Sequence, residues 1–288
     1  MNNINRHNGL YFLMFLAMIS WAIAWTNAKI VGEYLSFYNL TFFRFLLGFI
    51  SLLPFLLYNK KKLPPLRLYK YIIIPSILFF IYNIAFFKGT YFGEAGRGAI
   101  LVTTLNPLFT LIIISLIRKK ILLKEVLGII TGLFGGLIIM NIFKYGFDII
   151  FDIKNIYFLI CAITWGVMTV FIDLAQKKIN PYVFISLCYF FTMVISFFFT
   201  DFELIDLSSL DFRFYFNFFL VSIAAMSFGT SVYMYSTSII GPVKASVFIF
   251  SVPFLAMGTS YVFLNEIFSL NTMIGGLISL IAIYIVNK

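Results

Sequence analysis

The sequence predicts an all-α integral membrane protein in which ten transmembrane helices form two inverted five-helix repeats. Composition is the first observation: 62% of the 288 residues are hydrophobic and 11% are charged, whereas soluble domains average roughly 45–50% apolar and about 25% charged residues. The apolar excess is spread along the whole chain. Two further observations, the spacing of uncharged runs and an internal similarity, define the number and arrangement of the helices.

Ten apolar runs each approach the ~20 residues that an α-helix needs to cross a bilayer. They cover residues 8–28, 34–59, 71–87, 98–117, 126–143, 155–172, 179–200, 214–243, 245–265 and 267–287. The first run is longer than the apolar core of a signal peptide and contains Trp21 and Trp25. We therefore expect it to be a retained span, the first of ten.

The loops between these runs alternate in charge. Basic loops follow the second, fourth and sixth runs, with Lys60, Lys61, Lys62, Arg67, Lys70, Arg118, Lys119, Lys120, Lys124, Lys177 and Lys178. Acids balance or outnumber bases in the loops 144–154 and 201–214. Because short basic loops stay in the cytoplasm, both termini are expected there. The net charge of +10 then reflects topology and contact with anionic membrane lipids, and no nucleic-acid partner is expected.

The two halves of the chain, 1–145 and 146–288, are similar to each other. "ISWAIAWTNAKI" in the first run matches "ITWGVMTVFIDL" in the sixth and pairs Trp21 with Trp165. "GAILVTTLNPLF" matches "KASVFIFSVPFL" and pairs Pro107 with Pro253. Because each half has an odd number of spans, the second must enter the membrane from the opposite side. Inverted repeats of this kind are typical of secondary carriers.

The ordered set of motifs resembles the EamA-type members of the drug/metabolite transporter superfamily. It consists of "SWA" at 20–22, "TFFRFLLG" at 41–48, "AFFKGTYFGEAGRGAILVTTLNPLFTLII" at 85–113 and "SVFIFSVPFLAMGTSYVFLNEIFSLNTMIGG" at 246–276. The resemblance covers essentially the whole chain. It implies a bacterial inner-membrane transporter of small organic metabolites such as amino acids, which acts in export by alternating access around a central cavity.

One position departs from the family pattern. Members of the family usually carry a Glu in the loop before the last span of each half. Glu266 fits this place in the second half, but Lys119 takes it in the first. Lysine suits a cytoplasmic loop, so a role for a pair of glutamates does not carry over to this chain.

Catalysis and metal binding find no support in the sequence. It contains no phosphate-binding loop, and its acids lie at span ends rather than in the middle of the membrane. Cys161 and Cys188 lie inside predicted spans and His7 in the N-terminal tail, so no Cys/His cluster is available for a metal. We expect neither an enzyme nor a cofactor.

Two cations, Arg44 and Lys88, lie within the membrane in the half away from the cytoplasm. Each could reach the interface or pair with Glu33 or Glu94, or could bind an anionic group of a substrate. For Lys88, which lies near the outer end of its span, we favour the structural interpretation. For Arg44, which lies deeper, both interpretations stay open.

Five uncharged side chains complete the predicted substrate site. Trp21 and Trp165 are repeat mates in spans that line the cavity of the family, and Tyr82, Asn83 and Asn106 lie in mid-span. An amide facing lipid would be costly there, so its alternatives are substrate contact or a hydrogen bond between helices.

Pro107 and Pro253 occupy corresponding positions of matching spans. Proline frees a carbonyl one turn earlier, here Thr103 and Ile249, and bends a helix. Paired interruptions of this kind mark the binding site of many carriers, so a gating role is predicted for both prolines. Asn106 precedes only the first of them.

Small residues in the fifth and tenth spans, such as Gly128, Gly132 and Gly275, permit close helix approach. They predict packing within the chain or a homodimer through these two spans. A broad exporter of hydrophobic or cationic compounds, and a non-transporting receptor or assembly subunit, remain alternatives to a metabolite carrier.

Overall fold

The computed structural model describes residues 3–58, 62–146, 155–203, 207–264 and 269–287, and within these ranges the chain contains helices and no strand. The helices are α1 (Asn3–Val31), α2 (Phe37–Tyr58), α3 (Lys70–Phe92), α4 (Ala95–Arg118), α5 (Leu123–Ile139), α6 (Ile142–Tyr145), α8 (Ile156–Gln176), α9 (Pro181–Phe197), α10 (Phe212–Phe219), η4 (Leu220–Thr230), α11 (Ser231–Ile240), α12 (Pro242–Val247), η5 (Phe248–Ser251), α13 (Val252–Leu264) and α14 (Leu270–Asn287), with short 3₁₀ turns at Leu66–Leu68 and Leu207–Ser209. Lys60, Lys61 and Glu266 lie outside the described residues.

Eight helical segments of the described chain are long and apolar enough to cross a membrane. In one of them, Phe212–Ile240, the helices α10, η4 and α11 follow each other without a break. The fifth and seventh predicted spans correspond to α5 and α9, which contain 17 residues each. At ~1.5 Å per residue each is roughly 26 Å long. The all-helical membrane architecture is thus confirmed, whereas the count of ten spans stays a prediction.

Two predicted boundaries are wrong because a residue with positive φ ends the helix. Asn141 has a φ of 57° and follows the end of α5, so the fifth predicted span does not continue to residue 143. Gly241 has a φ of 89°, which glycine adopts without the steric cost of a Cβ. It separates α11 from Pro242, the first residue of α12. The eighth and ninth predicted spans are therefore divided at Gly241 and not at residue 244.

The helices of the two halves pack in a reciprocal pattern. α5 lies along α14, and α2 lies along α9. The contact of α3 with α8 has its counterpart in that of α1 with η4, and the contact of α4 with α8 in that of α1 with α13. One apolar core, which includes Met14, Phe158 and Met234, crosses both halves. A two-fold relation between the halves would produce this set of contacts.

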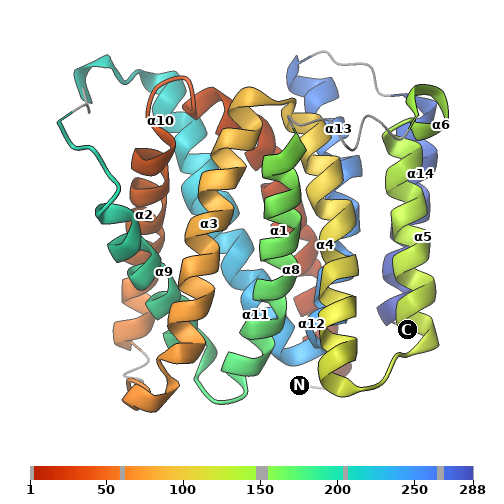
Figure 1. Cartoon of the computed structure of the whole chain (residues 1–288), viewed down its shortest axis with the longest axis horizontal. Coiled ribbons are helices and arrows are strands. Elements are labelled where there is room, and N and C mark those ends of the chain that lie inside the picture. Colours follow the sequence, from red (N-terminus) through yellow and green to blue (C-terminus); the bar gives the residue numbers. More distant parts are fainter. Residues whose placement is uncertain (1–2, 59–61, 147–154, 204–206, 265–268, 288) are drawn as a thin grey trace.

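The two ends of the bundle differ in charge. Figure 1 shows α1 beginning and α14 ending at its lower end, where the connections from α2 to α3, α4 to α5 and α8 to α9 also lie. The described basic residues of these connections and their flanks are Lys62, Arg67, Lys70, Arg118, Lys119, Lys120, Lys124, Lys177 and Lys178. At the opposite end Glu94 pairs with Arg97 and Glu33 with Arg213. The basic connections, the start of α1 and the end of α14 thus lie at the same end of the bundle.

The glycines of α5 and α14 are used between these two helices. A Cβ on Gly275 would meet the side chain of Ile139 at 2.6 Å and would collide with the backbone carbonyl of Gly135. A Cβ on Gly128 would collide with Val286. The predicted close approach of the fifth and tenth spans is therefore confirmed within one chain, at the edge of the bundle in Figure 1. A homodimer through the outer faces of these helices stays a prediction.

Candidate functional site

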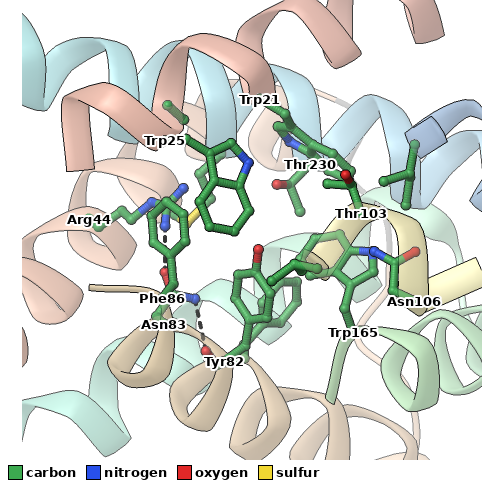
Figure 2. Close-up of a pocket in the computed structure, with 15 residues that line it drawn as sticks. Trp21, Trp25, Arg44, Tyr82, Asn83, Phe86, Thr103, Asn106, Trp165 and Thr230 are labelled. Atoms are coloured by element: carbon green, nitrogen blue, oxygen red, sulfur yellow. Dashed lines mark hydrogen bonds between the residues drawn. The ribbon is translucent and has the colours of Figure 1, made fainter. Parts of the chain in front are cut away.

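A cavity of about 40 Å³ lies between the two halves, and the predicted substrate-site side chains all line it. These are Trp21, Arg44, Tyr82, Asn83, Asn106 and Trp165, from α1, α2, α3, α4 and α8. Figure 2 shows them converging on the same space from different helices. The structure thus brings together six residues that lie as far as 144 positions apart in the sequence, with 21 and 165 as the outermost pair.

Six of the fifteen residues that line the cavity are aromatic. Trp21 and Trp165 meet edge to face with ring centroids 4.9 Å apart, and Tyr82 lies 4.9 Å from Trp165. On the side of α3, Phe86 packs edge to face against Trp25 at 4.9 Å. Edge-to-face pairs align the positive edge of one ring with the negative face of the other. The wall therefore combines packed aromatic rings with polar side chains such as Arg44, Asn83 and Asn106.

Sequence reasoning missed Trp25, Phe79, Phe86, Thr103 and Thr230, which also line the cavity. Helical spacing could have found the first four. Trp25 lies four residues after Trp21, and on α3 the ring positions precede and follow Tyr82 and Asn83 by three or four residues. Thr103 lies one turn before Asn106 in the same way. Thr230 had no such signal, because it ends an irregular helix.

Arg44 is buried, with 6% of its surface exposed, and hydrogen-bonds to neutral groups. Its Nη1 donates to Asn83 Oδ1 at 2.6 Å, and its Nε donates to the carbonyl oxygen of Val221 at 3.2 Å. The guanidinium also lies 5.3 Å from the ring centroid of Phe86. Arg44 therefore neither reaches the interface nor pairs with Glu33 or Glu94, and both structural alternatives for it are wrong. Those acids bind other arginines.

The guanidinium of Arg44 keeps binding capacity. Arginine has five N–H groups, and in the described structure two of them have protein acceptors. No described carboxylate forms an ion pair with it. Asn83 is held in a single orientation, because its Nδ2 donates to the carbonyl oxygen of Phe79 at 2.8 Å. Its Oδ1 is thereby turned toward Arg44, as Figure 2 shows.

Lys88 lies elsewhere. It is half-buried, does not line the cavity, and its Nζ lies 5.8 Å from the ring centroid of Tyr38 and 6.0 Å from that of Tyr157. Cation–π contacts of this kind stabilise an ammonium group that is partly removed from water. The geometry fits the structural interpretation of Lys88, although its predicted acidic partners bind arginines instead.

Asn106 faces the cavity beside Trp165 (Figure 2). Its Oδ1 is buried and has no hydrogen-bond partner within the described structure. A buried amide oxygen without a donor costs free energy comparable to a lost hydrogen bond. This oxygen is thus an available acceptor in the cavity, whereas the hydroxyl of the neighbouring Thr103 donates to the carbonyl oxygen of Ala99.

The two matched prolines lie in different backbone surroundings. α4 continues through Pro107 from Ala95 to Arg118. Pro253 instead lies in the first turn of α13, directly after the 3₁₀ turn η5. There the carbonyl of Ile249 accepts a hydrogen bond from the N–H of Val252. The expectation of a free carbonyl at Ile249 is therefore wrong, and gating at either proline stays a prediction.

A π-helix, η4, forms one side of the cavity through Met226 and Thr230. Side chains from three other helices donate to its carbonyl oxygens. Trp21 Nε1 binds the oxygen of Ala225 at 2.9 Å, and the Tyr189 hydroxyl binds that of Met226 at 2.8 Å. Arg44 provides the third contact, at Val221. π-helices are rare and concentrate at functional sites. The presence of one in the cavity wall, held by these three hydrogen bonds, therefore supports a functional role for the cavity.

Metal chemistry gains no support from the described residues. They contain no group of three or more His, Cys, Asp or Glu side chains that could hold an ion. Cys161 and Cys188 are buried as free thiols and lie on different helices, α8 and α9.

An all-helical bundle with many membrane-spanning segments and a buried cavity between its halves defines a polytopic transporter-like membrane protein. The model of the EamA-like transporter family matches residues 9–141 and again residues 153–288. The chain therefore belongs to the EamA-like transporter family.

Two further comparisons concern a curated relative and a solved structure. An uncharacterized transporter of Bacillus subtilis (strain 168), YoaV, is 23% identical over 264 residues, which cover 90% of this chain and 89% of the relative. A solved crystal structure shares the fold with a TM-score of 0.73 over 96% of both chains, at 16% sequence identity. The likeness in sequence is weak, and the likeness in fold extends over nearly the entire molecule.

Proposed function

We propose that this chain is a secondary carrier of the bacterial inner membrane that exports small organic metabolites bearing a carboxylate, such as amino acids. Arg44 carries the proposal. It is a buried cation in the cavity, it has unused N–H groups, and no described acid neutralises it. An Arg at the centre of a membrane helix costs about 2.5–3.5 kcal/mol on insertion scales. A substrate carboxylate would offset part of this cost through charge-assisted hydrogen bonds.

The remaining groups of the cavity suit the rest of such a molecule. The rings of Trp21, Tyr82 and Trp165 provide apolar surface and π-faces, and Asn106 Oδ1 provides a hydrogen-bond acceptor. An ammonium group can bind to both kinds of group. The cavity thus has one partner for each part of an amino acid with an apolar side chain.

The size of the cavity supports alternating access as the mechanism. Ligand pockets usually measure about 300–1,000 Å³, whereas this cavity measures about 40 Å³, so substrate enters only when the helices around it separate. Ten spans in two inverted halves would allow this by rocking. The reciprocal helix contacts and the two matches of the family model to successive halves support that arrangement. Both termini then lie in the cytoplasm with the basic connections.

Counterflow in proteoliposomes tests the proposal. Liposomes that contain the purified protein are loaded with an unlabelled amino acid or other organic acid, and uptake of the same compound in labelled form is measured. Arg44→Gln should weaken apparent affinity for a carboxylate substrate by about 1.5–3 kcal/mol, roughly tenfold to a hundredfold, the value of hydrogen bonds to a charged group. Lys88→Gln removes a membrane cation outside the cavity and should leave transport close to wild type.

Other outcomes would favour the alternatives. Counterflow of cationic or hydrophobic compounds, unchanged or enhanced in Arg44→Gln, would indicate a broad exporter that uses the aromatic wall. Absence of counterflow with every compound would contradict a carrier function and favour a receptor or assembly subunit.

A further inference from the structure

A second and larger hollow, here called the apolar cleft, lies between α1, α2, α9, η4 and α11. Its volume is about 430 Å³, which falls in the range of pockets that bind ligands. Its lining includes Leu10 near the start of α1, Phe55 near the end of α2 and Tyr182 in the first turn of α9. The cleft therefore lies in the half of the bundle that carries the basic connections (Figure 1).

The surface of the cleft is mainly apolar. Most of its lining side chains are apolar, and three of its four serines have hydrogen-bond partners within the protein. Ser51 Oγ donates to the carbonyl oxygen of Gly48 at 2.8 Å, and Ser227 Oγ donates to that of Ser222 at 3.3 Å. Ser231 Oγ lies 3.4 Å from the hydroxyl of Tyr189. A polar solute would lose its hydration here without compensation, whereas an apolar chain loses nothing.

The mouth of the cleft opens sideways into the bilayer. The lining residues Leu13, Phe55 and Phe228 are 40%, 59% and 37% exposed, and all three lie in membrane-spanning segments. At that depth the surrounding solvent is lipid hydrocarbon. The molecules that reach the mouth are therefore lipid acyl chains.

Groups that favour an anionic lipid headgroup flank the cleft at the basic end. Tyr182 stacks on Tyr235 with centroids 5.7 Å apart, both in the lining, and tyrosines of this kind sit at headgroup level. Lys177 and Lys178 directly follow α8, in its connection to α9. Lys177 forms an ion pair with Asp173 at 2.6 Å, so Lys178 is the cation without an acidic partner among these described residues. Lys178 is exposed and donates to the hydroxyl of Tyr71 at 2.5 Å. Basic side chains near the cytoplasmic surface attract anionic phospholipids.

We propose that the apolar cleft is a lipid site that binds one acyl chain of an anionic glycerophospholipid, with the headgroup at the connection that carries Lys178. Its place in the cytoplasmic leaflet rests on the proposed topology, and the site itself does not depend on the transported substrate. The bound chain contacts Ile223 and Phe228 of η4. The same helix lines the central cavity through Met226 and Thr230, so the lipid supports the wall that the two sites share.

Photochemical labelling of the full-length protein tests this site. Liposomes contain phosphatidylglycerol with a diazirine in one acyl chain, and labelled residues are identified by mass spectrometry. Residues of the cleft, such as Leu52, Ile185 and Ile223, should be labelled about tenfold more than the exposed Ile77 and Ile81 of α3, which corresponds to about 1.4 kcal/mol of preference. Equal labelling of the two sets would overturn the proposal.

Variants separate a specific site from general lipid contact. Ser186 is 2% exposed in the lining, so Ser186→Phe fills the cleft and should abolish its labelling while α3 is labelled as before. Ile77→Phe is the matched control on the exposed face of α3 and should leave the labelling of the cleft unchanged. If Ser186→Phe does not fold, Ile223→Trp provides a second filling variant. Unchanged cleft labelling in a folded filling variant would overturn the proposal.

The headgroup part has its own arm. Labelling by diazirine-bearing phosphatidylcholine should be weaker than by phosphatidylglycerol, and the difference should disappear in Lys178→Gln. Equal labelling of the wild type by the two lipids would overturn the choice of an anionic headgroup. All these readouts are independent of transport, so they can fail or succeed separately from counterflow.

Discussion

At the scale of single residues, the contact between Arg44 and Asn83 governs the charge of the cavity. Asn83 Oδ1 is neutral and lies 2.6 Å from Arg44 Nη1, so the guanidinium keeps its full charge for a ligand. The backbone bond from Asn83 Nδ2 to Phe79 holds the amide in place. An aspartate at this position would have nearly the same shape as Asn83, but its negative charge would make it a counter-ion of Arg44.

We predict that Asn83→Asp weakens binding of carboxylate substrates by tenfold or more. The new carboxylate would lie at the position of Oδ1 and form an internal ion pair with Arg44, and one pair of unit charges at close range is worth several kcal/mol at low dielectric. Competition in counterflow by anionic and neutral analogues of one substrate measures the effect. Neutral analogues should keep their affinity. An equal loss for both kinds of analogue would show that Asn83 acts only in packing.

The sequence predicted those cavity residues whose side chains are energetically costly inside a membrane, or which the internal repeat pairs with each other. Arg44 and Asn83 are expensive in a membrane unless they face a partner or a cavity, and Trp21 and Trp165 were linked by the repeat. It could not place Phe79 or Phe86, because in a chain with 38 Phe composition does not separate a wall residue from one that faces lipid. The direction in which each helix faces the cavity depends on packing between distant segments.

At the scale of helices, the close packing of α5 against α14 requires glycine, which has no side chain, at the positions where the two helices touch. Gly275→Ala would push a methyl group against Ile139 and the carbonyl of Gly135. We predict a destabilisation of about 1–3 kcal/mol, the usual cost of overpacking, seen as a lower thermal unfolding temperature in detergent. Gly258→Ala in α13 is the control, because no atom lies within 4 Å of the added Cβ. Equal unfolding temperatures for the two variants would contradict the close approach.

Helix irregularities were the part of the fold that the sequence could not provide. Hydropathy predicts where spans lie, but it is insensitive to hydrogen-bond register, so the π-helix at Leu220–Thr230 left no trace in it. The break at Gly241 was hidden from hydropathy, because the apolar run continues on both sides of it, although the dipeptide Gly241–Pro242 is a turn signal that the sequence does contain. Backbone changes of this kind depend on tertiary partners, such as the donors Trp21 and Tyr189, which sequence periodicity does not reveal.

At the scale of the whole molecule, the segregation of charge predicts the orientation in the membrane. Glu94→Cys, whose wild-type side chain is 69% exposed, should react with a membrane-impermeant thiol reagent in intact cells. Lys120→Cys, at the opposite end, should react only after the membrane is opened. Cys161 and Cys188 are fully buried, so the parent protein provides the unlabelled background. Labelling of Lys120→Cys in intact cells would reverse the proposed topology.

The composition of the cavity wall also has a spectroscopic consequence. The chain contains three tryptophans, and Trp21, Trp25 and Trp165 all line the central cavity. Their ultraviolet emission therefore originates at one place in the molecule, without background from remote indoles. A compound that enters between these rings alters their polarity and mutual stacking, and so shifts or quenches the emission of the unmodified protein. The protein thus contains its own optical probe, which reports occupancy of the cavity without any label.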